Sequence, residues 1–255
     1  MHYEQGIKGS RGLDPLQGGA EGGAEPPPFF LVPGISNGSR VKAFFTDKNI
    51  GIDRDGICAL FGREVDFYMP VQRHTDLSVT ILRDQPLTLE GCVADAVITD
   101  RPGIVIGVQT ADCVPILVLD SHKHVIAAIH AGWRGTAKGI FKAVVATMRT
   151  DFSCNPQDIL IAVGPSIKSC CYEVGGDVMD EVRQTTGVGD YIRQEAGRWY
   201  VDLARANLYQ ALAVGLAESN VWISPDCTFC LPDRYHSYRR TKAGTGRQGG
   251  FIGML

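Results

Sequence analysis

The sequence predicts an α+β fold with mixed β-sheets, and three observations lead to this prediction. Short, β-branched apolar runs recur along the chain, and such runs favour strands over helices. Several of these runs precede the first helical segment, so strands and helices do not alternate as in a purely parallel sheet. No internal repeat or linker divides the 255-residue chain after Phe29, and this length can bury one large core. We therefore expect a single domain.

The apolar runs and the helical periodicity place the individual elements. Strands are expected at Val41–Phe45, Leu77–Leu82, Ala96–Thr99, Val105–Val108, Ile116–Leu119, Val125–Ile129 and Ile159–Val163. Helices are expected at Gly135–Thr150, Gly176–Thr186 and Asp202–Glu218. Asp202 is a suitable N-cap for the last helix, because its carboxylate can accept a backbone N–H of the first turn. Residues 1–28 are rich in Gly, Pro and charge, which predicts a flexible N-terminal arm before a single catalytic domain at 29–255.

The composition argues against several classes of protein. The net charge is only −3 at pH 7, so we expect neither a nucleic-acid nor a membrane partner. The sequence has no run of about 18 apolar residues that could cross a membrane, and its N-terminus lacks the pattern of a secretory signal. Eight cysteines without such a signal are expected to be reduced thiols in the cytoplasm.

Three potential metal ligands stand at the ends of apolar runs. His74 lies in VQRHTD before one run, Cys113 lies in TADCVPIL before another, and His130 closes a third. Two imidazoles and one thiolate suit a borderline-soft ion such as zinc, and they leave a fourth position for water or substrate. Strand ends on a rigid sheet would hold such ligands more firmly than loops would. From spacing alone, structural roles are favoured, because a lone histidine or cysteine is more often structural than a ligand.

The motifs around these residues resemble one family. TADCVPILV, HAGWRGT, GPSIKSCCYEV, CTFC and SYRRTKAGTGRQGGFIGML occur in the order found in the family called multicopper polyphenol oxidase (laccase), purine nucleoside phosphorylase or peptidoglycan editing factor. The match runs from about Pro70 to the C-terminus. It implies two mixed β-sheets packed together with flanking helices. It also implies a zinc ion bound by the histidines of QxH and HAGWRG and the cysteine of ADC, here His74, His130 and Cys113.

The chain departs from the family pattern in two places. Members carry His-Gly in the first ligand motif, where this chain has His74 followed by Thr75. An arginine-bearing loop of the form TRxGGxS is replaced by FFTDKNIGIDRDG, in which Lys48 is the candidate for the arginine's place. The contribution of this loop to substrate binding is therefore an open question.

Three further residues are candidates for catalytic roles. Asp112, beside the cysteine, can act as a general base, fix a histidine tautomer or cap a turn. Arg134 and Arg240 carry guanidinium groups that suit a phosphate, and pairing with surface carboxylates is the alternative. Arg239 and Arg247 extend the basic cluster around Arg240.

Other residues of the motifs have more than one interpretation. Gly132 permits a sharp turn and a close approach to a ligand. Trp133 can wall a flat ligand or plug the core. Cys227 and Cys230 have CxxC spacing, but no second CxxC completes a zinc cage, so we interpret them as reduced thiols. No chemical role follows from the sequence for Cys170 and Cys171, and we expect His122 and His124 in an exposed turn.

The resemblance implies a zinc-dependent purine nucleoside phosphorylase that acts on adenosine, inosine and methylthioadenosine, with adenosine deaminase activity. Its substrates would be a purine nucleoside and phosphate. In deamination, zinc would activate a water for attack on C6 of the purine. In phosphorolysis, Arg134, Arg240 and Lys48 are the candidates for holding the anion.

Three other functions are weighed against this one. A copper-dependent polyphenol oxidase could use the same ligands, although six histidines are few for several copper ions. A metal-free hydrolase could use the Cys113 thiolate with His130 as base on an amide or a cell-wall precursor. A nucleotide-binding module without catalysis is the third.

Overall fold

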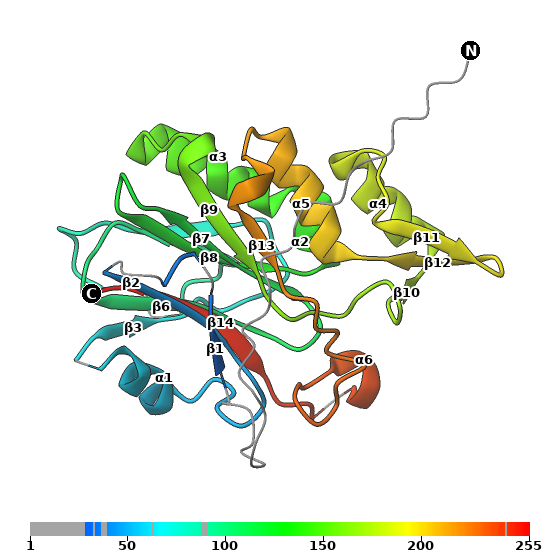
Figure 1. Ribbon diagram of the computed structural model, residues 1–255, viewed down its shortest axis with the longest axis horizontal. Coiled ribbons are helices and arrows are strands. Elements are labelled where there is room, and N and C mark those ends of the chain that lie inside the picture. Colours follow the sequence, from blue (N-terminus) through cyan, green and yellow to red (C-terminus); the bar gives the residue numbers. More distant parts are fainter. Residues whose placement is uncertain (1–28, 33, 37–39, 63, 88–90, 243) are drawn as a thin grey trace.

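Two β-sheets stacked face to face form the centre of the molecule in the computed structural model (Figure 1). The structure describes residues 29–32, 34–36, 40–62, 64–87, 91–242 and 244–255. The arm predicted at residues 1–28 lies outside the described residues, so the boundary at Phe29 stays a prediction. Among the described residues, no helix is both long and apolar enough to cross a membrane.

The first sheet has five strands and contains the pairing that is most distant in sequence among the described strands. Its strand order is β1 (Phe29–Leu31), β2 (Val41–Thr46), β14 (Gln248–Met254), β6 (Ile104–Thr110) and β3 (Asp66–Tyr68). Only β3 and β6 pair in parallel, so the sheet is mixed. Strand β14 lies between β2 and β6 and completes the middle of the sheet.

The second sheet has six strands and carries the residues of interest. Its order is β13 (Val221–Ile223), β9 (Ile159–Val163), β7 (Val114–Asp120), β8 (Val125–Ala131), β5 (Ala96–Thr99) and β4 (Ser78–Ile81). The two outermost pairs are parallel and the inner pairs antiparallel, so this sheet is also mixed. A small third sheet consists of β10 (Glu173–Val174), β12 (Arg198–Val201) and β11 (Ile192–Glu195).

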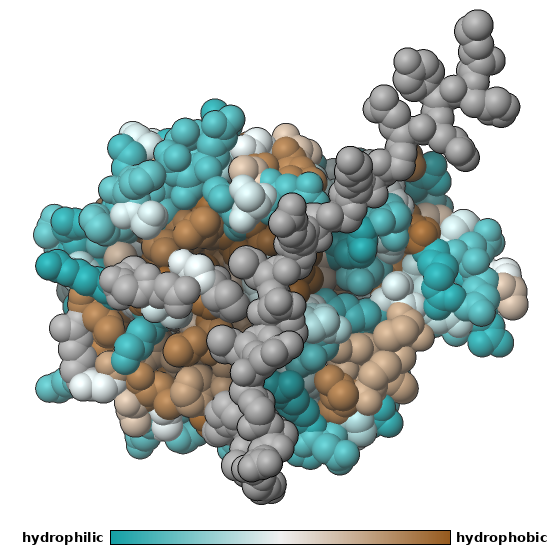
Figure 2. Space-filling view, viewed as in Figure 1, coloured by the Kyte–Doolittle hydropathy of each residue, from teal (hydrophilic) through white to brown (hydrophobic). Residues whose placement is uncertain are grey.

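Helices cover the outer faces of both large sheets (Figure 1). The six-stranded sheet packs against α2 (Trp133–Lys138), α3 (Ile140–Phe152), α4 (Gly176–Thr186) and α5 (Leu203–Ala213). The five-stranded sheet packs against α1 (Arg54–Phe61). A short helix, α6 (Tyr238–Thr241), and two 3-10 turns at Pro156–Asp158 and Glu218–Asn220 complete the described elements. Figure 2 shows hydrophilic residues over the helical layer and hydrophobic residues gathered across the middle of the molecule.

Burial on both faces explains why the central strands are continuous apolar runs. In β7, Ile116 and Val118 belong to the core beneath the helices, whereas Leu117 and Leu119 belong to the core between the sheets. A strand that is covered on both sides has no solvent face on which polar residues could alternate. The predicted α+β fold of two packed mixed sheets with flanking helices is confirmed, and so are the predicted strands.

The helices depart from the prediction at two points. The predicted helix Gly135–Thr150 is two helices, because Gly139 adopts a left-handed conformation (φ 76°) that ends α2 and begins α3. The helix predicted to end at Glu218 ends at Ala213. Its predicted N-cap is confirmed, since the Asp202 carboxylate accepts the Arg205 N–H at 3.0 Å.

Glycines let the sheets approach each other around one aromatic side chain. A Cβ on Gly164, which follows β9, would lie 2.4 Å from the ring of Phe45 in β2. A Cβ on Gly250 in β14 would lie 2.8 Å from the same ring. The fully buried Phe45 ring therefore occupies space that only glycines leave free.

We expect Gly164→Ala to lower the free energy of unfolding by about 1–3 kcal/mol, because neither Phe45 nor the sheet can move freely in a packed core. Urea unfolding followed by circular dichroism measures this change. Gly176→Ala is the matched control, because a Cβ there meets only the Trp199 Nε1 atom at 3.9 Å. Equal stability of the two variants would contradict this account of the packing.

Candidate metal centre

The three predicted ligands converge on one point. One ligand atom each from His74, Cys113 and His130 lies within 4.8 Å of the others. The Nε2 atom of His74 is 3.9 Å from the Cys113 sulfur, and the two imidazole centroids are 4.9 Å apart. Ligands bound to zinc at about 2.0–2.3 Å in a tetrahedron lie roughly 3.5 Å apart, so the observed spacing fits such an ion.

Pairing between β7 and β8 brings two of the ligands together. Pro115 lies opposite His130 in the antiparallel register, so Cys113, just before β7, lies near the end of β8 that carries the histidine. The third ligand, His74, comes from the loop before β4. His130 is buried and His74 is exposed, so the centre opens toward solvent on the His74 side. Three protein ligands with one accessible side are typical of a catalytic rather than a closed structural site.

One buried carboxylate orients both histidines. Asp95 accepts a hydrogen bond from His130 Nδ1 at 2.8 Å, which leaves Nε2 as the ring atom available to a metal. It also accepts the backbone N–H groups of His74 (3.0 Å) and Thr75 (2.6 Å). Burial alone would raise the pKa of Asp95, but hydrogen bonds from His130 and Thr75 hold it well below its usual range. Asp95 was not among the residues predicted from the sequence, where its only signal was a lone carboxylate directly before an apolar run.

The same carboxylate accounts for the departure at the first ligand motif. His74 has a left-handed backbone (φ 60°), a conformation that costs a non-glycine residue free energy unless its surroundings hold it. The Thr75 hydroxyl donates to Asp95 at 2.7 Å and accepts the Leu77 N–H at 3.2 Å, two hydrogen bonds that the glycine expected from the resemblance could not make. Threonine therefore adds a hydrogen bond to the network that holds the ligand loop.

The expected close approach at Gly132 is present, and the groups that approach are the candidate ligands themselves. A Cβ on Gly132 would lie 3.0 Å from both the Cys113 sulfur and the His74 Cδ2 atom. A larger residue would have to displace a ligand. Glycine at the turn after β8 is therefore required by the geometry of the centre.

The ligands form a charged pair when no ion is bound. Burial opposes ionisation of Cys113, but the charge of His130 and hydrogen bonds from both histidines lower the pKa of the thiol to about 6. Burial likewise opposes protonation of His130, while the Cys113 sulfur and Asp95 raise the pKa of the imidazole to about 9. Between these values the two groups exist as thiolate and imidazolium.

The predicted catalytic residue Asp112 binds the C-terminal part of the chain. Its carboxylate accepts the hydroxyl of Thr228 at 2.6 Å, the hydroxyl of Ser237 at 3.0 Å and the backbone N–H of Arg239 at 2.6 Å. Its backbone is left-handed (φ 89°), so the residue forms a turn directly before Cys113. The carboxylate that orients a histidine is Asp95, whereas Asp112 connects the cysteine to the start of α6. Proton transfer by Asp112 stays a prediction.

Tyr172 lies near the Cys113 sulfur and near two arginines, Arg239 and Arg134. Burial, followed by the neighbouring Cys113 sulfur, raises the pKa of Tyr172 to about 12, so its phenol is neutral at pH 7. The guanidinium of Arg239 lies 4.9 Å from the phenol centroid, and the charge of Arg134 also acts on Tyr172. Tyr172 was not singled out from the sequence, because the CCYEV motif gave no chemical reason to choose it.

The remaining basic candidates stack on aromatic rings or bind carbonyls. Arg134 is exposed and lies 4.3 Å from the ring centroid of Trp133, which packs at the edge of the core. Arg240 is also exposed, lies 4.3 Å from the Phe229 centroid and donates to the Phe229 carbonyl. The Lys48 amine donates to the carbonyl of Pro232 at 3.1 Å, so the altered loop contacts the segment before α6.

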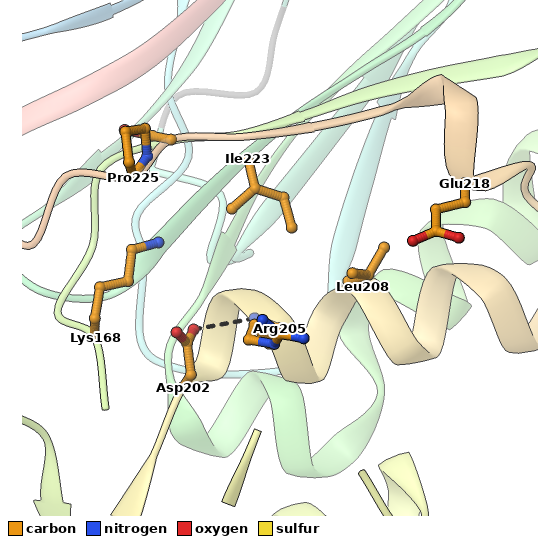
Figure 3. Close-up of a pocket in the computed structure, with 8 residues that line it drawn as sticks. Lys168, Asp202, Arg205, Leu208, Glu218, Ile223 and Pro225 are labelled. Atoms are coloured by element: carbon orange, nitrogen blue, oxygen red, sulfur yellow. Dashed lines mark hydrogen bonds between the residues drawn. The ribbon is translucent and has the colours of Figure 1, made fainter. Parts of the chain in front are cut away.

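A separate cavity of about 410 Å³ lies between α5 and β13 (Figure 3). Its lining includes Lys168, Asp202, Arg205, Glu218, Ile223 and Pro225. Burial lowers the pKa of Lys168, and the charge of Asp202 opposes this shift. None of the three metal-ligand candidates lines this cavity, so its charged walls are not part of the centre described above.

We expect Asp95→Asn to weaken zinc binding about tenfold to a hundredfold, because the amide cannot replace the anionic partner of His130. Competition against a chromophoric chelator measures the affinity. Asp100→Asn removes a carboxylate that pairs with Arg83 at the surface and should bind zinc as tightly as the unmodified protein. Cys113→Ser, which removes a ligand, should bind zinc more weakly than Asp95→Asn. Unchanged affinity in Asp95→Asn would exclude this role.

In the metal-free protein, alkylation of Cys113 by iodoacetamide should have its midpoint near pH 6. The thiol pKa is lowered in the folded state, so the reactive thiolate forms as the pH rises through about 6. Peptide mass spectrometry across a pH series identifies the alkylated cysteine. The same protein in urea should show a midpoint near the ordinary thiol value, and coinciding midpoints would refute the effect of the histidines.

The chain is similar to enzymes and structures of known name. It is 37% identical to purine nucleoside phosphorylase YlmD of Geobacillus stearothermophilus over 162 residues, which are 62% of this chain and 59% of that protein. It is 36% identical over 193 residues to adenosine deaminase RL5 from an unknown prokaryotic organism, covering 71% of this chain and 72% of that one. Less than two thirds of the length of YlmD is thus matched.

The fold has a solved counterpart in Bacillus licheniformis. The crystal structure of hypothetical protein YfiH superimposes with a TM-score of 0.82 at 26% identity, over 91% of this chain and 98% of that one. The family model described as "Multi-copper polyphenol oxidoreductase laccase" matches residues 46–255, which include all three candidate ligands. The chain therefore belongs to the multi-copper polyphenol oxidoreductase laccase family.

Proposed function

We propose that this chain is a zinc-dependent purine nucleoside phosphorylase that acts on adenosine, inosine and methylthioadenosine, with adenosine deaminase activity. The observation that carries the proposal is the site of two histidines and one cysteine, with Asp95 behind it. Relatives named purine nucleoside phosphorylase and adenosine deaminase support the choice of substrate. The free thiols are in keeping with a cytoplasmic location.

The donor set favours zinc at this centre. Imidazole and thiolate together suit zinc, and the exposed His74 side leaves a position for a substrate atom. Zinc supplies Lewis-acid chemistry at this point when it is bound. The protein's part is to keep Cys113 as a thiolate, and Asp95 fixes the His130 tautomer by accepting the hydrogen bond that the Nδ1–H group donates.

Basic residues near the centre would bind the phosphate. Stacking of Arg134 on Trp133 leaves the edge of its guanidinium free to form two parallel hydrogen bonds with an anion. Arg240 offers the nitrogens that it does not use on the Phe229 carbonyl. Lys48 is a further candidate, because it contacts the same C-terminal segment.

Asp112 and Tyr172 would have different roles, Asp112 in proton transfer and Tyr172 as a hydrogen-bond donor. In phosphorolysis a phosphate oxygen bonds to C1′ of the ribose while the C1′–N9 bond breaks, and the departing purine takes up a proton. Tyr172, neutral at pH 7, is a suitable donor of a hydrogen bond to the base, while the proton itself would come from the phosphate or from solvent. Asp112 would act as the proton acceptor in deamination and keep Thr228 and Ser237 in place.

Copper-dependent polyphenol oxidation is the second candidate, and the family description favours it. A site of two histidines and a cysteine can also hold copper. Within the described residues, however, the imidazoles grouped with a thiol are those of His74 and His130, whereas His122 lies in an exposed turn beside Asp158. A cluster of several copper ions needs more imidazoles than this centre supplies. A Cys113 hydrolase is the third candidate, and it would require the metal-free thiolate.

Inosine or adenosine should yield free base only when phosphate is supplied, with the zinc-loaded protein and chromatographic detection of the base. Arg134→Ala and Arg240→Ala should each raise the phosphate requirement about tenfold or more, because each removes a charged hydrogen-bonding group worth about 1.5–3 kcal/mol. The nucleoside requirement should stay largely unchanged.

The exposed Arg149 in α3 provides the matched control, and Arg149→Ala should behave as the unmodified protein. Equal cleavage with and without phosphate would indicate hydrolysis instead. Oxygen uptake with a phenol and copper, or amide hydrolysis by the metal-free protein, would each support the corresponding alternative.

A further inference from the structure

Four cysteines from two distant loops meet at a second point in the molecule. Cys170 and Cys171 precede β10, and Cys227 and Cys230 lie between β13 and α6. Their four sulfurs lie within 4.8 Å of one another. The Cys230 sulfur is 3.6 Å from that of Cys170 and 3.3 Å from that of Cys171. The adjacent cysteines Cys170 and Cys171 thus take the place of the second CxxC motif that the sequence lacks. Adjacent cysteines do not have the usual spacing of zinc ligands, so the sequence gave no sign of this cluster.

We propose that Cys170, Cys171, Cys227 and Cys230 bind a structural zinc ion. Four thiolates form a closed tetrahedral zinc site, with sulfur atoms about 2.3 Å from the ion and therefore roughly 3.8 Å from one another. The observed sulfur–sulfur distances are close to this value. This second ion is distinct from the one proposed for the His74 centre, since the two sites share no ligand.

The backbone holds both pairs of cysteines in turns. The N–H groups of Cys230 and Leu231 each donate to the Cys227 carbonyl at 3.1 Å, which folds the CTFC segment back on itself. The N–H groups of Cys171 and Tyr172 each donate to the Lys168 carbonyl at 2.9 Å. A parallel bridge between Ser166 and Cys227 joins the two segments. The sulfurs are therefore brought together by hydrogen bonds that do not involve them.

Local charge also suits a thiolate-bound ion. A zinc ion with four thiolates carries a net charge of −2, so it is stabilised by N–H donors and cations nearby. The Lys168 N–H points at the Cys227 sulfur at 3.5 Å, and the charge of Lys168 acts on both Cys170 and Cys227. Figure 3 shows the Lys168 side chain in the wall of the cavity.

The proposed ion would brace the segment that approaches the first centre. Thr228, inside the CTFC turn, donates a hydrogen bond to Asp112. The ring of Phe229 packs against the guanidinium of Arg240. A fixed CTFC turn therefore fixes the groups that hold Asp112 and Arg240. Metal binding at the four thiols is independent of the reaction that the first centre performs.

Zinc analysis of the purified full chain by mass spectrometry should give two zinc ions per chain. Cys230→Ser and Cys113→Ser should each give one ion, and the double variant should give none. Cys58→Ser changes a half-buried thiol that belongs to neither cluster, and it should keep both ions. In the cobalt-substituted protein, the intense visible bands of a tetrathiolate site should be lost in Cys230→Ser and kept in Cys113→Ser.

Cys230→His separates loss of the ion from loss of the fold, because a histidine can replace one thiolate in a zinc site. This variant should keep two zinc ions and melt at a higher temperature than Cys230→Ser. An unchanged zinc content in Cys230→Ser, whether the unmodified protein holds one ion or two, or a Cys171–Cys230 disulfide in protein purified without oxidant would each overturn the proposal.

Discussion

The hydrogen bonds of the Asp95 carboxylate are the interactions on which the candidate metal centre depends. The carboxylate is completely buried, and the groups that surround it come from the loop before β4 and from β8. Removal of a buried partner of this kind leaves several donors unsatisfied, at a cost of about 1–3 kcal/mol for each group. Because the same carboxylate holds the His130 ring and the strained backbone at His74, the His130 imidazole and the loop that carries His74 stay in place even when no ion joins them.

The antiparallel pairing of β7 and β8 supplies the second constraint. Both strands are buried on each face. A shift in register by one residue would therefore exchange the side chains packed beneath the helices with those packed between the two sheets. The distance between Cys113 and His130 is thus set by the packing of the whole six-stranded sheet. The Asp112 turn extends this rigidity to the C-terminal segment, so the two cysteine-containing clusters are joined through Asp112 and Thr228.

The sequence predicted the central strands and the convergence of His74, Cys113 and His130, but it gave no signal for several features that depend on residues distant in the chain. Runs such as Val125–Ile129 are apolar because both faces are buried, and the motif matches indicated which residues at their ends would meet. Strand β14 was not predicted, because it contains Gly249, Gly250 and Gly253, and glycine is a poor strand residue. These glycines leave room for aromatic rings, namely those of Phe251, Phe45 and Phe61, that would collide with a Cβ. Asp95 and Tyr172 were missed since their importance lies in partners that are distant in sequence. The vicinal cysteines have a partner pair only in three dimensions, so spacing gave no signal.

The position of β14 in the middle of its sheet has a consequence for how the protein is made. Strands β2 and β6 leave the ribosome long before β14 exists, and each presents an unpaired edge toward the other until then. Such edges can pair with other chains, and pairing over so large a sequence separation forms slowly. During synthesis the exposed edges of β2 and β6 must therefore be kept from pairing with other chains, by a chaperone or by their separation, until β14 pairs with both of them.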